Sequence, residues 1–431
     1  MKLFPHQESA LARTQGRNRV AYYHDMGLGK TFTGSEKMMQ LGADVNLIIC
    51  QKSKINDWVN HFREHYVWKT GGHIFNLTDK HDFEDFFDRV YDLGMIIGII
   101  NYELAWRRPE LLKLQDFTLM LDESSLIQNS KAKQTKFILK LKPANVILLS
   151  GSPVSGKYEN LYSQIKLLGW DISESTYNKQ YINWTTMNFG SHMVRMVDKK
   201  NPYKNVDRLK EKLRENGCDF LKTEECFDLP EQTFITIDVP TSKEYKKFMR
   251  DSIVTVDGDE LVGDSTLVKR LYARQLCGAY NKEKLQAFKA LVESTNDRLI
   301  VFYTYTKELV EMLAIVNDMG RPHSIVNGKT KDLTAYEEHD DSITFVQYQA
   351  GAKGLNLQKA NKMIYFTLTD SVENWMQSAK RINRIGQTRP CFYYILKCKG
   401  SVEEKIHEAL ERGEDFVWDL FDEEISQRKP C

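Results

Sequence analysis

The feature that most constrains the fold is a glycine-rich loop near the start of the chain. Residues 24–31, His-Asp-Met-Gly-Leu-Gly-Lys-Thr, lie between an apolar run at 20–23 and a stretch with helical character at 32–41. In such a loop, backbone N–H groups surround phosphate oxygens, a lysine neutralises their charge and a hydroxyl helps to hold Mg²⁺. A helix that starts at the loop directs its partly positive N-terminus at the same phosphates. The stretch therefore predicts a strand, a phosphate-binding loop and a helix, with a simple glycine turn as the alternative because His24 replaces the pattern's first glycine.

Further apolar runs alternate with helix-length segments in the first half of the chain. They lie at residues 46–50, 94–100, 117–121 and 145–150. Runs of this length and spacing are typical of buried strands in a mostly parallel α/β sheet. Ligands bind at the carboxyl ends of such strands, so the polar motifs that follow these runs are the candidate functional residues.

An acidic pair, Asp122-Glu123, follows the third of these runs. In a nucleotide-hydrolysing site the first carboxylate holds Mg²⁺, and the second orients and deprotonates the attacking water. A solvated turn is the alternative for an Asp-Glu pair at a strand end. The phosphate loop upstream favours the catalytic interpretation.

The second half of the chain repeats the strand pattern, with apolar runs at 299–303, 343–348, 362–367 and 391–397. A chain of 431 residues is too long for one core, so a second α/β sheet is expected. Residues 349–357, Gln-Ala-Gly-Ala-Lys-Gly-Leu-Asn-Leu, follow the second run. Their glycines permit close backbone approach to a phosphate or ribose, and a plain strand-to-helix turn is the alternative.

A glutamine and two arginines follow at helical spacing. On a helix, Gln377, Arg381 and Arg384 would share one face by the i, i+4, i+7 rule. Arginine suits phosphate because its planar fork binds two oxygens and keeps its charge. These arginines would stabilise the charge that develops at a γ-phosphate, whereas an arginine-rich surface helix is the alternative.

Overall charge and cysteine usage limit the classes of partner. Lysine and arginine number 60 against 59 aspartates and glutamates, so a nucleic-acid surface must be a local stripe. Basic residues gather at 195–214, which predicts either a phosphate-tracking segment or a helical excursion with a solvated face. Seven scattered cysteines without zinc spacing, no signal core and no membrane-length apolar run favour a cytoplasmic protein with no membrane partner.

The motifs, taken in order, resemble those of the SWI/SNF-type ATPases, a superfamily-two, helicase-like family of double-stranded DNA translocases. The resemblance runs from Phe4 to Ile406 and rests on residues 4–7, 25–31, 50–58, 100–104, 121–129, 149–153, 349–357 and 377–387. The sequence departs from the family's motifs at three places. His24 and Asp25 replace an acidic pair, and Ser125 replaces a histidine, although its hydroxyl can still relay a hydrogen bond. Residues 370–375 lack the family's Trp-Asn-Pro, which indicates a divergent, minimal member.

The resemblance implies two RecA-like lobes, each a mostly parallel sheet flanked by helices. The N-terminal, ATP-binding lobe would span residues 1–230 with a helical insertion at about 170–225. The C-terminal helicase lobe would span residues 231–431 with a helical insertion at about 240–290. ATP, with Mg²⁺, would be hydrolysed at the interface of the lobes, and the protein would move along duplex DNA as a monomer, with a separate targeting subunit as a further partner.

The resemblance also implies site residues. The catalytic set is Lys30, Asp122, Glu123, Arg381 and Arg384, and the Mg²⁺ ligands are Thr31 and Asp122. The nucleotide would be bound by Gln7, Gly27, Leu28, Gly29, Lys30, Thr31 and Gln377. The DNA backbone would be contacted by Lys52, Ser53, Tyr102, Ser152, Gly351 and Lys353.

Two other functions remain open on the sequence. A strand-separating DNA or RNA helicase would use the same motor, but no strand-splitting wedge is visible in the sequence. A nucleotide-gated nucleic-acid-binding module with weak hydrolysis is suggested by Ser125.

Overall fold

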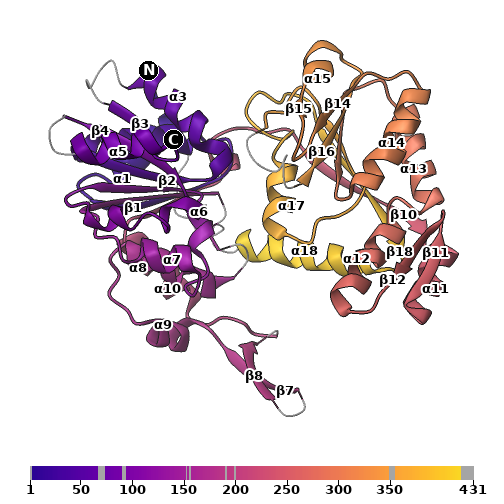
Figure 1. The fold of residues 1–431 in the computed structure, drawn as a ribbon, viewed down its shortest axis with the longest axis horizontal. Helices are drawn as coiled ribbons and strands as arrows, with labels where there is room; N and C mark the ends of the chain where they lie inside the picture. The colour runs from indigo at the N-terminus through magenta and orange to yellow at the C-terminus, as the bar shows by residue number, and fades with distance from the viewer. Residues whose placement is uncertain are drawn as a thin grey trace. The chain divides into compact units, whose positions relative to one another are not determined.

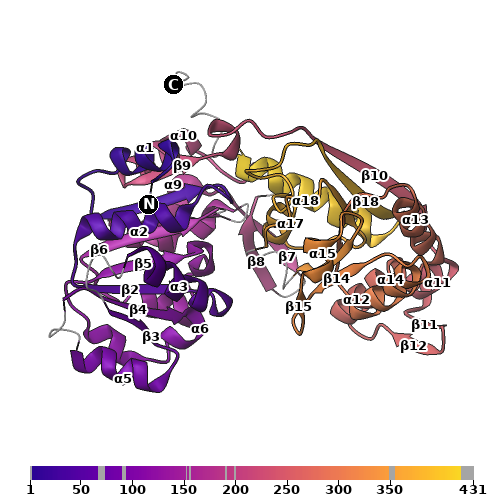
Figure 2. The same ribbon diagram turned by 90° about the horizontal axis from the view of Figure 1, so that it is seen from above.

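The computed structural model describes residues 2–66, 73–89, 94–151, 153–154, 157–189, 192–198, 200–348 and 355–418. The chain divides into two compact units, of which unit 1 is built on Met1–Cys226 and unit 2 on Phe227–Asp415. Each unit contains its own seven-stranded sheet, and helices flank the strands in both (Figure 1 and Figure 2). The fold class expected from the sequence, two mostly parallel α/β sheets, is confirmed.

Unit 1 has a sheet with the strand order β3-β4-β2-β5-β6-β1-β9, in which every pair is parallel. All carboxyl ends therefore lie at one edge, where the polar motifs follow the strands. The strands are β1 Arg19–His24, β2 Val45–Cys50, β3 His73–Asn76, β4 Ile96–Asn101, β5 Thr118–Asp122, β6 Asn145–Ser150 and β9 Cys218–Leu221.

The helices of unit 1 connect these strands. They are α1 Pro5–Arg13, α2 Lys30–Leu41, α3 Ile55–His65, α5 Lys80–Arg89, α6 Tyr102–Ala105, α7 Lys133–Ile138, α8 Tyr162–Leu167, α9 Glu174–Tyr181 and α10 Val206–Glu215. One core layer joins α1, α2 and α3 to alternate residues of the central strands, and includes Ala10, Met38 and Trp58. Since residues two apart on a strand face the same side, these helices cover one face of the sheet.

Three elements of unit 1 were not predicted from the sequence. The edge strands β3 and β9 have only four residues each, too few for a clear apolar run. The segment expected to be a helical insertion, residues 170–225, also contains an antiparallel hairpin of β7 Trp184–Phe189 and β8 His192–Val197. The sequence carried a signal for it, because Gly-Ser at 190–191 separates two runs with strand-forming residues.

Unit 2 has a sheet with the strand order β10-β18-β17-β13-β16-β14-β15. Only the β14–β15 pair is antiparallel among the described strands of this sheet. The strands are β10 Gln232–Pro240, β13 Leu299–Tyr303, β14 His323–Val326, β15 Lys331–Asp332, β16 Ile343–Gln347, β17 Lys362–Tyr365 and β18 Cys391–Lys399. The four strands expected from apolar runs are confirmed, and β10, β14 and β15 are additional.

The helices of unit 2 lie between these strands and in the segment before β13. They are α11 Lys243–Asp251, α12 Thr266–Cys277, α13 Lys282–Glu293, α14 Thr306–Asp318, α15 Thr334–Glu338, α17 Val372–Ala379 and α18 Val402–Trp418. A small hairpin, β11 Ile253–Val256 with β12 Asp259–Val262, lies between α11 and α12. Its turn uses Asp257 and Gly258 at φ 49° and 84°, as an Asp-Gly hairpin turn requires.

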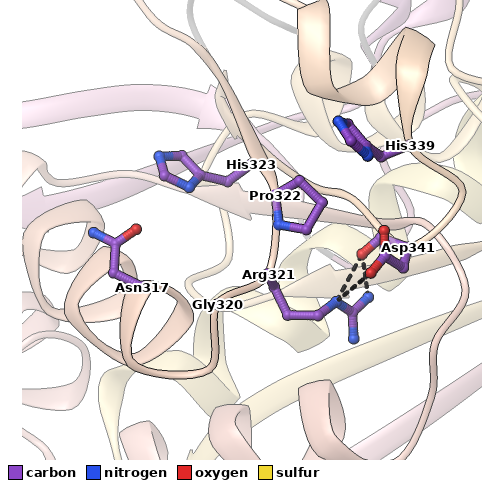
Figure 3. A pocket seen from close by; sticks show the side chains of 7 residues that line it. All are labelled: Asn317, Gly320, Arg321, Pro322, His323, His339 and Asp341. Atoms are coloured by element: carbon purple, nitrogen blue, oxygen red, sulfur yellow. Dashed lines mark hydrogen bonds and ion pairs between the residues drawn. The ribbon is translucent and has the colours of Figure 1, made fainter.

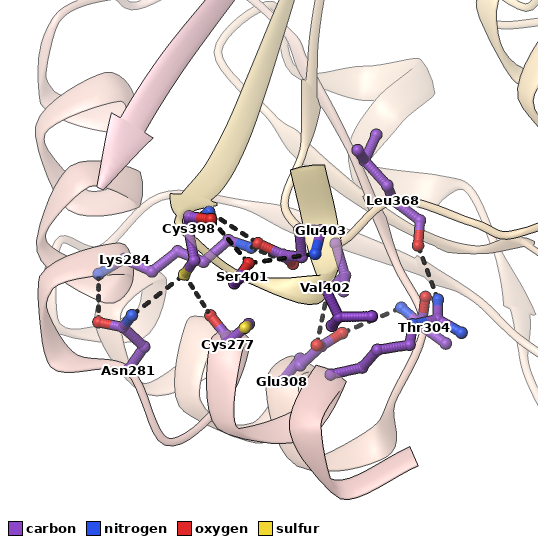
Figure 4. Close-up of polar contacts among 12 residues, drawn as sticks. Cys277, Asn281, Lys284, Thr304, Glu308, Leu368, Cys398, Ser401, Val402 and Glu403 are labelled. Atoms are coloured by element: carbon purple, nitrogen blue, oxygen red, sulfur yellow. Dashed lines mark hydrogen bonds and ion pairs between the residues drawn. The ribbon is translucent and has the colours of Figure 1, made fainter. Parts of the chain in front are cut away.

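A buried ion pair fixes two helices of unit 2 to its sheet (Figure 4). Lys284 Nζ of α13 donates to both carboxylate oxygens of Glu403 on α18, at 2.7 and 2.9 Å. The same carboxylate accepts from the backbone N–H of Cys398 on β18 at 2.9 Å. Cys277 and Cys398 lie beside it with their ligand atoms within 4.8 Å of Glu403, but Lys284 already neutralises the carboxylate, and burial raises the pKa of the Cys277 thiol. We therefore assign this cluster a structural role rather than a metal site.

Candidate nucleotide-binding site

The phosphate loop joins β1 to α2 in a conformation that depends on its glycines. Gly27 and Gly29 have φ angles of 91° and 69°, and α2 starts at the next residue, Lys30. The ammonium of Lys30 donates to the backbone carbonyls of His24 and Asp25 at 2.8 and 3.1 Å. The lysine is therefore folded over the end of β1, at the N-terminus of a helix, where an anion is favoured.

The side chain of Gln7, on α1, supports this loop through a hydrogen bond to its backbone. Its amide is 2 % exposed, and its Nε2 donates to the carbonyl of Gly29 at 3.1 Å, while its Oε1 accepts from the N–H of Phe4 at 2.9 Å. A Cβ on Gly29 would lie 2.4 Å from Gln7 Nε2, so this contact requires glycine. The structure thus brings Gln7 to the phosphate loop, and its expected contact with adenine stays a prediction.

Asp122 ends β5 at the carboxyl edge of the sheet and is fixed by an indole. Trp58 of α3 donates its Nε1–H to Asp122 Oδ2 at 2.8 Å. Burial is the main cause that raises the pKa of Asp122, with the charge of Glu123 adding to it, whereas the Trp58 hydrogen bond and Lys30 act in the opposite direction. Because desolvation makes the charge of this carboxylate costly, a bound cation would stabilise it, and carboxylate oxygens are ligands that Mg²⁺ prefers. Thr31 and Asp122 as Mg²⁺ ligands stay a prediction.

Glu123 is held in a strained but well-supported position. Its φ is 58°, in the left-handed region that few residues other than glycine adopt. Its Oε1 accepts hydrogen bonds from Ser125 Oγ at 3.0 Å and from Ser150 Oγ, at the end of β6, at 2.7 Å. The hydroxyl of Ser125 therefore does contact the carboxylate, as the sequence led us to expect, and Ser150 is a second support that sequence reasoning missed.

Tyr102 was expected to contact the DNA backbone, and this contact stays a prediction. The side chain is 1 % exposed, and its hydroxyl donates to the carbonyls of Asp122 and Glu123 at 3.0 and 3.4 Å. Tyr102 therefore holds the backbone of the acidic pair in place.

Asp219 of β9 organises the base of the phosphate loop and was not found from the sequence. It accepts from His24 Nε2 at 2.7 Å and from Arg13 at 2.5 and 2.9 Å. Burial alone would raise the pKa of Asp219, but the hydrogen bonds from His24 and Arg13 outweigh it and lower the pKa. Because β9 was not predicted, no sequence signal linked Asp219 to the loop.

The arginines of unit 2 do not share a helical face with Gln377, contrary to expectation. Helix α17 ends at Ala379, so Gln377 is on the helix and donates to Glu373 at 3.0 Å, while Arg381 and Arg384 follow in turns. The chain leaves the helix because the turn is tied to the segment that precedes β17. There, Leu357 N–H donates to the Arg381 carbonyl at 3.2 Å.

Both arginine side chains nevertheless contact the same group, the backbone carbonyl of Leu355. Arg381 Nη1 and Arg384 Nη1 each donate to the carbonyl of Leu355 at 3.2 Å, and Arg384 also donates to Asn356 Oδ1 at 2.6 Å. Burial lowers the pKa of Arg384, yet a guanidinium remains charged at any ordinary pH. Leu355 and Asn356, at the end of the motif at residues 349–357, therefore hold the two arginines.

Gln387 keeps this turn closed. Its Nε2 lies within hydrogen-bonding distance of the carbonyls of Gln358, Ala360 and Ile382, at 3.1, 2.8 and 3.2 Å. Gly386 precedes it at a φ of 93°. The Ile-Gly-Gln end of the motif thus has a structural function in this chain.

The remaining nucleic-acid predictions are only partly described. Lys52 and Ser53 are exposed in a short 3₁₀ turn after β2, at the carboxyl edge of the unit 1 sheet. Ser152, Gly351 and Lys353 lie outside the described residues. Lys52 and Ser53 therefore stay predictions with suitable positions.

A hollow of about 440 Å³ in unit 2 is not this site (Figure 3). It lies where β14 and β16 begin, at their amino ends, and Asn317, His323 and His339 line it. The guanidinium of Arg321, which also lines it, already donates to the carbonyls of Thr295 and Asp297 at 2.8 and 3.1 Å. Ligands of parallel sheets bind at the opposite ends of the strands.

Comparisons with known proteins match most of the chain to two family models. A family model described as SNF2-related domain matches residues 13–285, and one described as Helicase conserved C-terminal domain matches residues 283–386. A putative ATP-dependent helicase/translocase, YwqA of Bacillus subtilis, is 24% identical over 94% of this chain and 48% of its own length. The mouse SWI/SNF-related matrix-associated actin-dependent regulator of chromatin subfamily A member 1 is 23% identical, over 90% of this chain and 40% of its own length.

The chain thus spans about half the length, or less, of these curated relatives. A solved structure, the Sulfolobus solfataricus SWI2/SNF2 ATPase core in complex with dsDNA, is 18% identical and aligns over 98% of this chain and 93% of its own, with a TM-score of 0.44. Within the part of the chain that the structure describes, no helix has both the length and the apolar character needed to cross a membrane.

Proposed function

This chain belongs to the SNF2-related family, and we propose that it is an ATP-driven translocase on double-stranded DNA. The observation that carries the proposal is the constellation at the carboxyl edge of unit 1. There, the phosphate loop with Lys30 lies at the end of β1, and the Asp122-Glu123 pair lies at the end of β5. This combination can bind a nucleotide's phosphates and activate a water molecule beside them.

Within unit 1 each side chain has a distinct task. Lys30 neutralises the β- and γ-phosphates and exchanges its present carbonyl partners for phosphate oxygens. Glu123 accepts the proton of the attacking water, and the hydroxyls of Ser125 and Ser150 aim its carboxylate. Thr31 and Asp122 would hold Mg²⁺, which when bound neutralises charge on the phosphates.

In unit 2, Arg381 and Arg384 supply positive charge to the γ-phosphate of the same nucleotide. Support comes from family membership and from their convergence on one carbonyl, that of Leu355. A phosphate would replace this neutral acceptor with charged oxygens, which guanidinium groups bind more strongly. Binding and hydrolysis would then alternate between closed and open arrangements and move the protein along the DNA backbone.

The proposal is tested by the rate of ATP hydrolysis with blunt duplex DNA, single-stranded DNA, RNA or no polymer. Duplex DNA is expected to stimulate the rate most, and the stimulation should fall steeply with salt because it depends on phosphate contacts. Stimulation by single strands alone would instead favour the strand-separating helicase. A flat rate near zero with every polymer would favour the nucleotide-gated binding module.

A strand-separating activity has one observation in its favour, the β7–β8 hairpin, which was not predicted from the sequence. A projecting ribbon can act as a wedge between the strands of a duplex. The hydrolysis assay therefore compares single-stranded DNA and RNA directly with duplex DNA.

A further inference from the structure

The β7–β8 hairpin is a separate ribbon of unit 1. Its six residue pairs, from Trp184↔Val197 to Phe189↔His192, form a two-stranded sheet that is not included in the seven-stranded one. Figure 1 shows it projecting from unit 1 beyond α9, away from the strands of the main sheet. A two-stranded ribbon is only marginally stable by itself, so a ribbon that projects in this way has to be supported at its base.

The base of the hairpin is firmly built. Asp198 N–H donates to Asn183 O, and Asn183 N–H donates to Pro202 O, each at 2.9 Å. Ile182 forms a bridge with Tyr203, whose hydroxyl donates to Glu159 at 2.9 Å. These bonds continue the ribbon into the body of unit 1 and anchor its base there.

One face of the ribbon combines apolar and cationic side chains. Arg195 is directly opposite Thr186, and residues two apart on a strand share a face, so Trp184, Met193 and Arg195 lie on the same side. The guanidinium of Arg195 is 4.7 Å from the centroid of the Trp184 ring. Met193 is 77% exposed, more than the 58% of Val310, another exposed apolar side chain. The ribbon therefore presents the exposed side chain of Met193 on the same face as the Trp184–Arg195 pair.

The ribbon and the segment that follows it are strongly basic. Residues 184–214 contain eight lysines and arginines against three acidic residues, a net charge of +5, whereas the whole chain carries +1. Arg195, Lys200, Lys204 and Arg208 are all exposed. This charge complements a polyanion, which favours nucleic acid over an ordinary protein surface.

We propose that the β7–β8 hairpin binds nucleic acid at a junction where duplex gives way to unpaired bases. Met193 and Trp184 pack on base faces, and Arg195 with the basic segment contacts the flanking phosphates. Base faces are hidden inside a continuous duplex and become accessible at a fork, and exposed methionine and aromatic side chains pack on or between such bases. This inference rests on the proposed function and adds the shape of the substrate.

The experiment compares binding of forked and blunt duplex DNA of equal length, with 2-aminopurine at the first base pair of the fork. Wild-type protein is expected to prefer the fork and to raise the fluorescence, because the base is unstacked. Met193→Gln, which keeps charge and length, should weaken fork binding about tenfold and leave blunt-duplex binding unchanged, the size expected for losing one base contact. Arg195→Gln should lower the salt slope of log affinity by about one.

The matched control is Val310→Gln, which replaces an exposed apolar residue on α14 and should change neither affinity. A stronger variant replaces residues 185–196 with Asn-Gly, which joins the Trp184–Val197 pair by a tight turn and leaves the base intact. If this variant and the wild type bind the fork with equal affinity and give equal fluorescence, the inference is overturned. The same result is expected if the hairpin binds a protein instead of nucleic acid. If duplex DNA does not stimulate ATP hydrolysis by the wild-type protein, the proposed function is overturned. That result is separate from the comparison of fork binding.

Discussion

The two seven-stranded sheets carry the proposed reactive side chains at their edges in different ways. In unit 1, Glu123 and Asp122 are aimed by side-chain donors, the hydroxyls of Ser125 and Ser150 and the indole of Trp58. In unit 2, Arg384 donates to a backbone carbonyl and an amide oxygen of its own unit. Unit 1 therefore holds its carboxylates through side-chain donors, whereas under the proposed function the arginine of unit 2 would have to exchange its present partners before it could bind a phosphate.

The largest expected effect comes from the arginine. Arg384→Ala should lower the rate of DNA-stimulated ATP hydrolysis by about a thousandfold or more, as for other arginines that stabilise a transferring phosphoryl group. Arg384→Lys should not restore it, because an ammonium lacks the planar fork. The control is Arg389→Ala, an exposed arginine that pairs with Asp297. A full rate in Arg384→Ala would show that the arginine takes no part in hydrolysis.

In unit 1, Glu123→Gln should lower the rate by about 10²–10⁴-fold, the range for loss of a general base. ATP binding should persist, because the phosphate loop is untouched. Lys30→Ala should lose hydrolysis and binding together. Equilibrium binding of a fluorescent ATP analogue separates the two, and equal loss of binding in both variants would contradict the division of tasks.

The hydroxyls that aim Glu123 should give a smaller effect. Ser150→Ala and Ser125→Ala each remove one hydrogen bond to a charged acceptor, which is worth about 1.5–3 kcal/mol. Each should therefore lower kcat by about tenfold or more, with KM unchanged. Ser163→Ala, an equally buried serine on α8, is the control. If both variants keep the wild-type kcat, the two hydroxyls do not orient the Glu123 carboxylate for hydrolysis. The contrast drawn between the carboxylates of unit 1 and the arginine of unit 2 would then be wrong.

The smallest effect is on stability against acid. Burial, with help from His65, lowers the pKa of His61 to about 4, and His61 Nε2 contacts Ser35 Oγ of α2 at 3.0 Å. An unfolded histidine has a pKa of about 6.5, so its stabilising contribution is complete above that pH and is lost as the pH falls toward about 4. The melting temperature of His61→Gln should fall less than that of the wild type between pH 7.5 and 5. If the melting temperatures of the variant and the wild type fall equally over this pH range, the acid sensitivity comes from other groups, such as His24.

The sequence predicted those features of the molecule that depend on local pattern. The phosphate loop, the Asp122-Glu123 pair and the nine strands with clear apolar runs are short-range signals, and the structure contains each of them. Other features depend on distant contacts that a periodicity does not encode. Asp219 reaches His24 only because β9 pairs with β1, and α17 stops at Ala379 while the following turn is tied to residues 355–360.

The most direct test of the central claim measures the affinity for ADP with aluminium fluoride, which mimics the transferring phosphoryl group, against that for ADP alone. If Arg384 acts on the phosphoryl group that the phosphate loop binds, Arg384→Ala should lose affinity for the mimic by about a hundredfold or more and keep its affinity for ADP. Lys30→Ala should lose affinity for both. Unchanged affinity for the mimic in Arg384→Ala would mean that the two sets of residues serve different ligands, and would contradict the account.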